Sequence, residues 1–260
     1  MQLETGFRDA WGESISFDQF MVLQGEVFRD VVGRRTLRFV LGEASYFIKI
    51  HTGIGWREIF KNLFQGKLPV LGAGNEVKAI RKLEELGVET MTIVGYGERG
   101  LNPAKKQSFI ITKDLRDTVS LEDLCATWTK QTPSFVLKKM LITRVAGMAR
   151  ALHENGINHR DFYICHFLLK QQSVGASQLH LYLIDLHRAQ IRSKTPERWL
   201  LKDLAGLYFS AMDIGLTRND LYRFLREYRG LSLRKIFSEE KSFWGKVRHK
   251  AEKLYVSYTP

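Results

Sequence analysis

The chain of 260 residues carries 40 lysines and arginines against 28 aspartates and glutamates, which gives a formal net charge of +12. Its hydrophobic content of 44% can supply a full core, in one large domain or in two lobes, so disorder is not the default. The charge predicts an anionic partner, which could be nucleic acid, an acidic membrane surface, a phosphorylated glycan or an acidic protein.

Location is predicted from what the sequence does not contain. No apolar run approaches the roughly 18 residues of a membrane-spanning helix, so we expect any membrane contact to be peripheral. The first residues lack a basic and then apolar signal segment, and the two cysteines, Cys125 and Cys165, lie in different contexts. These features predict a protein of the reducing cytosol.

Three strands are predicted between Glu26 and Ile50 from alternating apolar residues and glycine turns. They span residues 27–32, 36–41 and 46–50, with turns at 33–35 and 42–43. Lys49 lies in the third strand and faces away from Ile48 and Ile50. By itself it would be an ordinary solvated lysine, so a function for it depends on the motifs that follow.

A basic amphipathic helix is predicted over residues 53–67. Its apolar stripe consists of Trp56, Ile59, Phe60, Leu63 and Phe64. Its positive charges are Arg57, Lys61 and Lys67. This helix either packs on a β-rich lobe or lies in the surface of an anionic bilayer, which large aromatic residues flanked by cations would suit.

A second helix is predicted from Glu76 to Glu85, after the glycine-rich residues 71–74 and with Asn75 as its N-cap. Val77, Ile80 and Leu83 would face inward. Glu76 in the first turn would stabilise the helix dipole, pair with Lys49, or do both.

The rest of the chain is predicted to be mainly helical. Residues 108–115 indicate a buried strand that leads into a linker, and Ser120 caps the helix that follows. A long helix with an ordinary core stripe at residues 137–152 ends at Gly156. Further helices are predicted at 196–212, 217–228 and 239–255, and the last is basic and aromatic. We therefore expect an N-terminal β-rich lobe at 1–112 and a C-terminal helical lobe at 113–260.

Two short motifs follow the long helix. The first is the run from His159 to His166, which begins His-Arg-Asp, and the second is Leu183-Ile184-Asp185-Leu186-His187. Together they resemble the catalytic and metal-binding loops of protein-kinase-like phosphotransferases. Phosphoryl transfer needs an oriented hydroxyl, a metal ion that bridges the nucleotide phosphates, and positive charge near the transferred group.

The resemblance implies a role for several residues. Asp161 would accept the proton of the substrate hydroxyl, Asp185 would bind Mg²⁺, and Lys49, held by Glu76, would contact the ATP phosphates. Arg160 and Asp203 would brace the catalytic loop. The backbone around Thr112, Asp114 and Leu115 would occupy the position of the hinge that meets adenine.

The sequence departs from the protein-kinase pattern at three places. Where those kinases have a metal-binding asparagine, five residues after the catalytic aspartate, this chain has His166, a softer metal ligand. No glycine follows Asp185-Leu186. The first hairpin has no glycine-rich loop, so Arg34 or Arg35 at its tip would have to contact the phosphates.

These departures themselves resemble a known family, the lipopolysaccharide core heptose kinases of Gram-negative bacteria. The similarity lies in residues 161–167, 184–188 and 72–76, and it extends from about Phe17 to Tyr255. It implies a kinase-like two-lobed α+β fold, ATP and Mg²⁺ as cofactors, and phosphorylation of the first heptose of the inner core.

The same resemblance implies a location and partners. The enzyme would act at the cytoplasmic face of the inner membrane, on an inner-core glycolipid and against an anionic bilayer surface. An acidic protein partner is a further possibility, and nucleic acid is not expected. The side chains that read the sugar would lie near His187, Arg188 and the C-terminal basic helix.

Three other interpretations compete with this one. A protein kinase would need room for a peptide-binding segment, and the interval from Asp185 to Pro196 is short. An antibiotic-type kinase acts on cationic acceptors, which would favour an acidic cleft and not a basic chain. A catalytically silent kinase-like module, or a basic protein that docks on an acidic partner such as a carrier protein or nucleic acid, stays open because of His166.

Overall fold

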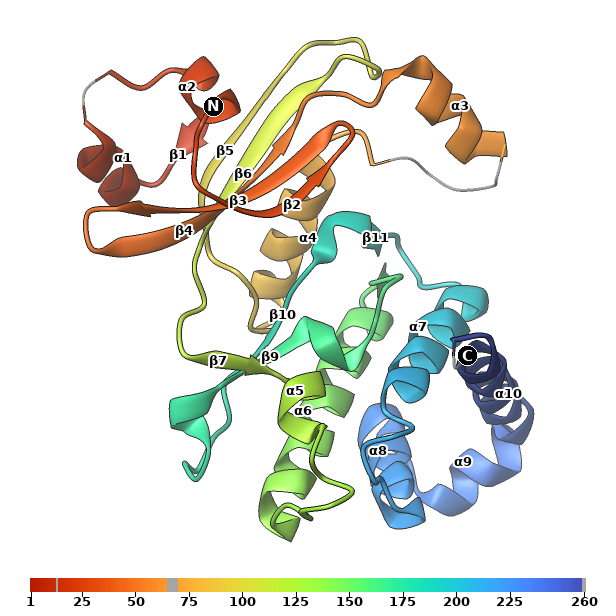
Figure 1. Ribbon diagram of the computed structural model, residues 1–260. Coiled ribbons are helices and arrows are strands. Elements are labelled where there is room, and N and C mark those ends of the chain that lie inside the picture. The colour runs from red at the N-terminus through yellow and green to blue at the C-terminus, as the bar shows by residue number, and fades with distance from the viewer. Residues whose placement is uncertain (13, 65–69, 259–260) are drawn as a thin grey trace. The chain divides into compact units, whose positions relative to one another are not determined.

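The computed structural model describes residues 1–12, 14–64 and 70–258, and the chain divides into two compact units (Figure 1). The first unit comprises residues 1–82 and 91–115, and the second comprises residues 83–90 and the described chain from Arg116 onward. The first is built on a six-stranded sheet and the second is mainly helical. The predicted α+β class is confirmed.

The sheet of the first unit is antiparallel, in the order β1-β5-β6-β4-β3-β2. Its strands are β1 (Gln2–Leu3), β2 (Glu26–Val31), β3 (Arg34–Leu41), β4 (Ala44–His51), β5 (Ile93–Arg99) and β6 (Gln107–Lys113). The three strands predicted between Glu26 and Ile50 are confirmed. β4, which carries Lys49, lies between β3 and β6, so its backbone is held on both sides.

The first hairpin turns one residue earlier than predicted. Val31 pairs with Arg34, so the two-residue turn is Val32-Gly33, and Gly33 has the positive φ of +78° that such a turn requires. The prediction that Arg34 and Arg35 form the tip is therefore wrong, because both already belong to β3.

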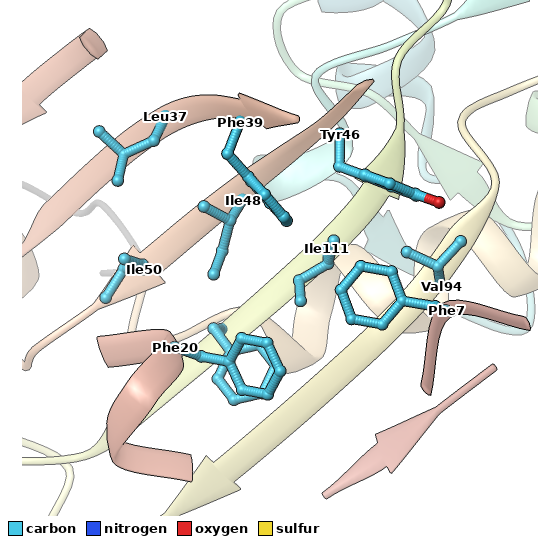
Figure 2. Close-up of a cluster of buried hydrophobic side chains, with 10 residues drawn as sticks. Phe7, Phe20, Leu37, Phe39, Tyr46, Ile48, Ile50, Val94 and Ile111 are labelled. Atoms are coloured by element: carbon cyan, nitrogen blue, oxygen red, sulfur yellow. The ribbon is translucent and has the colours of Figure 1, made fainter. Parts of the chain in front are cut away.

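One face of this sheet is covered by two short helices that the sequence analysis did not predict, α1 (Thr5–Trp11) and α2 (Phe17–Met21) (Figure 2). Phe7 of α1 meets Tyr46 edge to face with ring centroids 5.1 Å apart, and Phe20 of α2 lies 4.6 Å from the ring of Phe109. Aromatic rings bury large apolar areas, so two short helices are enough to cover this face of the sheet.

Two further helices belong to the first unit. α3 (Gly55–Phe64) is confirmed within the predicted range, and Lys67 lies outside the described residues. α4 spans Gly74–Glu85 and begins two residues earlier than predicted, so Asn75 lies inside its first turn and the prediction of an N-cap there is wrong. Val77, Ile80 and Leu83 are buried as expected.

The second unit packs six helices with two small sheets (Figure 1). Its helices are α5 (Leu121–Cys125), α6 (Phe135–Glu154), α7 (Glu197–Ser210), α8 (Arg218–Arg229), α9 (Leu233–Glu239) and α10 (Lys241–Tyr258), the short α5 lying beside β7. Its strands are β7 (Thr118–Ser120), β8 (Ile157–Asn158), β9 (Phe167–Lys170), β10 (Leu181–Leu183) and β11 (Gln190–Ile191). α6 packs on α8 and α7 on α10. Of the helices in the described residues, α9 was not predicted, and none is long and apolar enough to cross a membrane.

The chain leaves α6 through Gly156, which has a φ of +76° and leads into β8. A Cβ atom at this position would lie 1.8 Å from the carbonyl oxygen of Arg192, because β8 pairs with β11 and the next residues pass directly over the glycine. The predicted glycine at the helix end is confirmed, and the close approach explains why no larger residue fits there.

We expect Gly156→Ala to lower the free energy of unfolding by more than about 2 kcal/mol, because it combines a left-handed backbone with a backbone clash. The measurement is urea denaturation followed by circular dichroism. Gly147→Ala is the matched control, since Gly147 lies inside α6 with nothing within 4 Å of a Cβ, and it should gain up to about 1 kcal/mol. Equal stability of the two variants would contradict the assignment.

Candidate functional site

In the first unit, the predicted pair of Lys49 and Glu76 is formed. The Nζ atom of Lys49 lies 2.5 Å from Oε1 of Glu76, and the glutamate is only 1% exposed. A carboxylate buried to this degree needs a cationic partner, so the contact holds the lysine side chain toward α4. The second oxygen of Glu76, Oε2, has no hydrogen-bond partner among the described residues.

The other candidates for nucleotide contacts lie in this unit as ordinary parts of the sheet and its exit. Arg34 stands opposite His51, and Nε of Arg35 lies 3.7 Å from a carboxylate oxygen of Asp30. Thr112 is buried in β6, the N–H of Asp114 donates to the carbonyl of Ser45 at 3.0 Å, and Leu115 ends the unit. Their nucleotide roles stay predictions.

In the second unit, the catalytic loop is held by Asp203 of α7. Its carboxylate, 1% exposed, accepts the backbone N–H of His159 at 2.6 Å and that of Arg160 at 2.8 Å. These bonds hold Arg160 at a φ of +76°, a conformation that side-chain-bearing residues adopt at a cost and that occurs often at functional sites. The predicted brace by Asp203 is present.

Asp161, the next residue, is partly buried and paired with Arg188. The Nη1 atom of Arg188 lies 2.9 Å from Oδ1 and 3.0 Å from Oδ2 of the aspartate. The sequence analysis placed Arg188 only among candidates that read the sugar. Its contact with both oxygens instead orients the carboxylate, so Arg188 is a positioning residue for Asp161.

Asp185 lies between two histidines. Its Oδ1 accepts a hydrogen bond from Nδ1 of His187 at 2.6 Å, and its Oδ2 lies 3.7 Å from Nε2 of His166. Nδ1 of His166 donates to the carbonyl oxygen of Asp161 at 2.7 Å, so in the neutral ring the lone pair is on Nε2 and faces Asp185. Asp185 itself has a φ of +62°. The structure thus brings together the two residues predicted to bind metal.

The two motif loops are joined to each other. Nε2 of His159 donates to the carbonyl oxygen of Ile184 at 2.9 Å, and the N–H of Ile184 donates to the carbonyl oxygen of His166 at 3.0 Å. Burial lowers the pKa of His159, which keeps the ring neutral and suited to this single donated bond. Asp161 and Asp185 are therefore placed by one connected set of contacts.

The residues around Asp185 fit a metal ion that takes most of its ligands from elsewhere. The described residues contain no group of three or more histidine, cysteine or acidic side chains that could hold a metal by themselves. Mg²⁺ keeps several waters and is commonly bound by one or two carboxylates and by substrate phosphates. Asp185, with the lone pair of His166 beside it, matches that pattern.

Comparison with known proteins decides the family. A sequence model of the lipopolysaccharide kinase (Kdo/WaaP) family matches residues 18–228. The chain belongs to the lipopolysaccharide kinase (Kdo/WaaP) family. The two motifs therefore lie in a chain of a kinase family, and the protein-kinase alternative is not supported.

Members of this family with assigned names cover nearly the whole chain. The lipopolysaccharide core heptose(I) kinase WaaP of Escherichia coli K12 is 50% identical over 98% of this chain and 96% of its own. The heptose(I) kinase WaaP of Pseudomonas aeruginosa PAO1 is 52% identical over 97% of this chain and 95% of its own. A solved structure, WaaP in complex with acyl carrier protein, has a TM-score of 0.84 and 47% identity over 97% of this chain and 98% of that one. The predicted kinase-like fold is confirmed.

One group of residues at the catalytic loop was not found from the sequence. Arg160 was expected to brace the loop, yet it is its backbone that Asp203 holds, while its guanidinium makes no hydrogen bond within the described chain. The guanidinium lies over the ring of Trp199, with CZ 5.3 Å from the ring centroid. One arginine in a loop and one tryptophan in a helix carry no motif, so only the fold reveals their contact.

Proposed function

We propose that this protein is a lipopolysaccharide core heptose(I) kinase, which transfers the γ-phosphate of ATP to a hydroxyl of the first inner-core heptose. The observation that carries the proposal is sequence identity to two heptose(I) kinases, at about half of all residues and over nearly the full length. The Asp161–Arg188 pair supports it, because it supplies an oriented carboxylate for the hydroxyl proton.

The residues of the chain divide the reaction between them. Asp161 accepts the proton of the sugar hydroxyl as its oxygen bonds to the γ-phosphorus and the bond to the β-phosphate oxygen breaks. Lys49, held by Glu76, binds phosphate oxygens of the nucleotide. The backbone at the end of β6 and just after it, at Thr112, Asp114 and Leu115, meets the adenine.

Asp185 holds Mg²⁺, and His166 completes the protein's share of the metal site. Mg²⁺ held by these residues would supply positive charge that offsets the negative charge developing on the phosphates during transfer. The support is the position of both side chains and the left-handed backbone of Asp185. Arg34 and Arg35 lie at the start of β3, so a phosphate contact by either would come from a strand and not from a turn.

An acyl carrier protein is the proposed protein partner. The structural relative was solved in complex with acyl carrier protein, and the second unit contains a cavity of about 220 Å³. Its lining is mostly apolar and includes Leu141, Val145, Leu207, Phe224 and Val247. An apolar cavity of about 150 Å³ can stay dry and bind benzene, so this one suits part of an acyl chain.

We also propose that the protein works peripherally at the cytoplasmic face of the inner membrane. The apolar stripe of α3 is not packed away: Trp56 and Phe60 are half exposed, Phe64 is 90% exposed, and Ile59 alone among its five apolar side chains is buried. Trp56 stacks on Phe60, and Arg57 and Lys61 supply positive charge. Such a helix fits the headgroup region of an anionic bilayer, the second of the two interpretations given above.

We expect the wild type to transfer labelled γ-phosphate from Mg-ATP to purified core lipopolysaccharide that has heptose but lacks phosphate, and Asp161→Asn to be at least about 100-fold slower. Asp185→Ala should lose Mg²⁺-dependent ATP binding at least about tenfold, because the metal loses its carboxylate. Asp117→Asn, at an exposed aspartate of the same unit, is the control and should match the wild type. Folded wild type that binds ATP and transfers nothing would overturn the proposal.

Acyl carrier protein with a long acyl chain should raise the melting temperature of the wild type by several degrees, since a ligand at 100 times its Kd stabilises by about 2.7 kcal/mol. Ala211→Phe, which fills the cavity, should abolish the rise measured from its own baseline. Ala44→Phe, at an exposed position, should keep it. A rise that does not depend on the acyl chain would place the carrier elsewhere.

Vesicles that contain anionic lipid should sediment the wild type, and Trp56→Ser combined with Phe60→Ser should weaken the partitioning by about tenfold or more. The control is Val32→Ser combined with Leu101→Ser, which removes two exposed apolar side chains of the same unit. If both double variants bind as the wild type does, α3 is not the membrane contact.

A further inference from the structure

Four cations surround the ring of Trp199 in the second unit. The charged ends of Arg160 and Arg198 each lie 5.3 Å from the ring centroid, that of Arg192 lies at 5.8 Å, and Nζ of Lys202 lies at 5.7 Å. We call these five residues the Trp199 cluster. They come from the catalytic loop, from the segment after β11 and from α7, so the fold, and not one helix face, gathers them.

The positive charge of the Trp199 cluster is not neutralised by the protein. Arg160 is 7% exposed, yet its guanidinium makes no hydrogen bond in the described part of the chain, and its Nε is buried without a partner. Arg192 bonds only neutral amides, Asn158 and Gln190, both at 2.6 Å. Neither Arg198 nor Lys202 forms an ion pair with a described residue. A buried cation without an acceptor costs free energy, so this arrangement is not explained by stability.

The nearby acids are already engaged. Asp161 is paired with Arg188, and Asp203 is committed to two backbone N–H groups. Burial lowers the pKa of Lys202, and the charges of Arg160 and Arg188 lower it further against the opposing effect of Asp161. Arg160 directly precedes Asp161 in the chain, and the charge of Asp161 acts on the pKa of Lys202, so the cluster lies next to the candidate base.

A purely structural role accounts for part of the cluster only. Cation–π contacts with Trp199 would hold the side chains in place, and exposed contacts of this kind contribute about 0.5–1 kcal/mol. They do not supply the oxygen acceptors that a guanidinium takes elsewhere, and the indole Nε1 of Trp199 is itself buried without a partner among the described residues. Several N–H donors therefore lack an acceptor within one small region.

We propose that Arg160, Arg192 and Lys202 form an anion-binding subsite beside Asp161, which takes a carboxylate or phosphate carried by the acceptor next to the sugar that is phosphorylated. The acceptor chemistry rests on the proposed function, and the subsite adds how this enzyme recognises it. Guanidinium groups bind such oxyanions with paired, directed N–H bonds. An anion here also screens the mutual repulsion of the cations, so acceptor binding is favoured over an empty site.

The test compares Lys202→Met with the wild type on two acceptors: intact heptose-containing core lipopolysaccharide, and the same material after methyl esterification of its carboxylates and removal of its phosphates. On the intact acceptor, Lys202→Met should raise the acceptor KM about tenfold and change kcat and the ATP KM by less than about twofold. On the neutralised acceptor, wild type and variant should have the same raised KM. Lys202→Arg should restore the wild-type KM on the intact acceptor.

Lys139→Met is the matched control, because it removes one exposed lysine from α6 and the same charge from the protein. It should leave the KM for both acceptors unchanged. An equal rise of KM for intact and neutralised acceptors in Lys202→Met, or no rise for either, overturns the subsite. Arg160→Met should show the same acceptor dependence, which links the buried guanidinium to the anion and not to folding alone.

A binding measurement without ATP separates this proposal from the proposed function. The fluorescence of Trp199, obtained as the difference between wild type and Trp199→Phe, should change saturably on titration with the intact acceptor and not with the neutralised one. If this change is present and lost in Lys202→Met while no phosphate is transferred, the subsite stands and the kinase assignment fails. If transfer occurs without any dependence on Lys202, the kinase assignment stands and the subsite is wrong.

Discussion

The chemistry of the second unit depends on one buried carboxylate, that of Asp203. At 1% exposure it would be costly to keep charged, and the two short bonds from the backbone of His159 and Arg160 offset that cost. They also hold Arg160 in a left-handed conformation that it would not adopt by itself. This turn places the carboxylate of the next residue, Asp161, against Arg188 and the Arg160 guanidinium over the ring of Trp199. One acid on α7 thus sets up both the candidate base and the proposed anion subsite.

The second motif is coupled to the first through neutral groups. The ring of His159 donates to Ile184, and Ile184 donates back to His166, so the position of Asp185 follows from that of the catalytic loop. A neutral imidazole suits this role because burial lowers the pKa of His159 and leaves no added charge beside Asp185. Because these two hydrogen bonds already hold the loop that carries Asp185, no additional segment of the chain is needed to order it. This agrees with the short interval from Asp185 to Pro196.

The sequence was sufficient where a local pattern carries the information. Alternation located the strands around Lys49, and a 3.6-residue period located α6. The resemblance to kinase motifs singled out Asp161 and Asp185 and predicted the Lys49–Glu76 pair, which the structure forms. It failed where the outcome depends on a single register position. Val31 pairs with Arg34, which moves the turn by one residue and takes Arg34 and Arg35 out of it. The helices α1 and α2 are too short to show a period, and their aromatic residues make sense only against the sheet that they cover.

The Trp199 cluster shows why net charge was a weak guide to the partner. Many cations of this chain are paired with acids: Arg38 with Glu26, Arg99 with Asp18, Arg248 with Glu252. Exposed pairs of this kind contribute little and mark no site. Arg160 and Lys202 differ because neither is paired with an acceptor among the described residues, and Arg160 is in addition buried away from water. The pairing state of a cation, and not the total of +12, therefore distinguishes a binding surface from a solvated one, and only the folded chain reveals it.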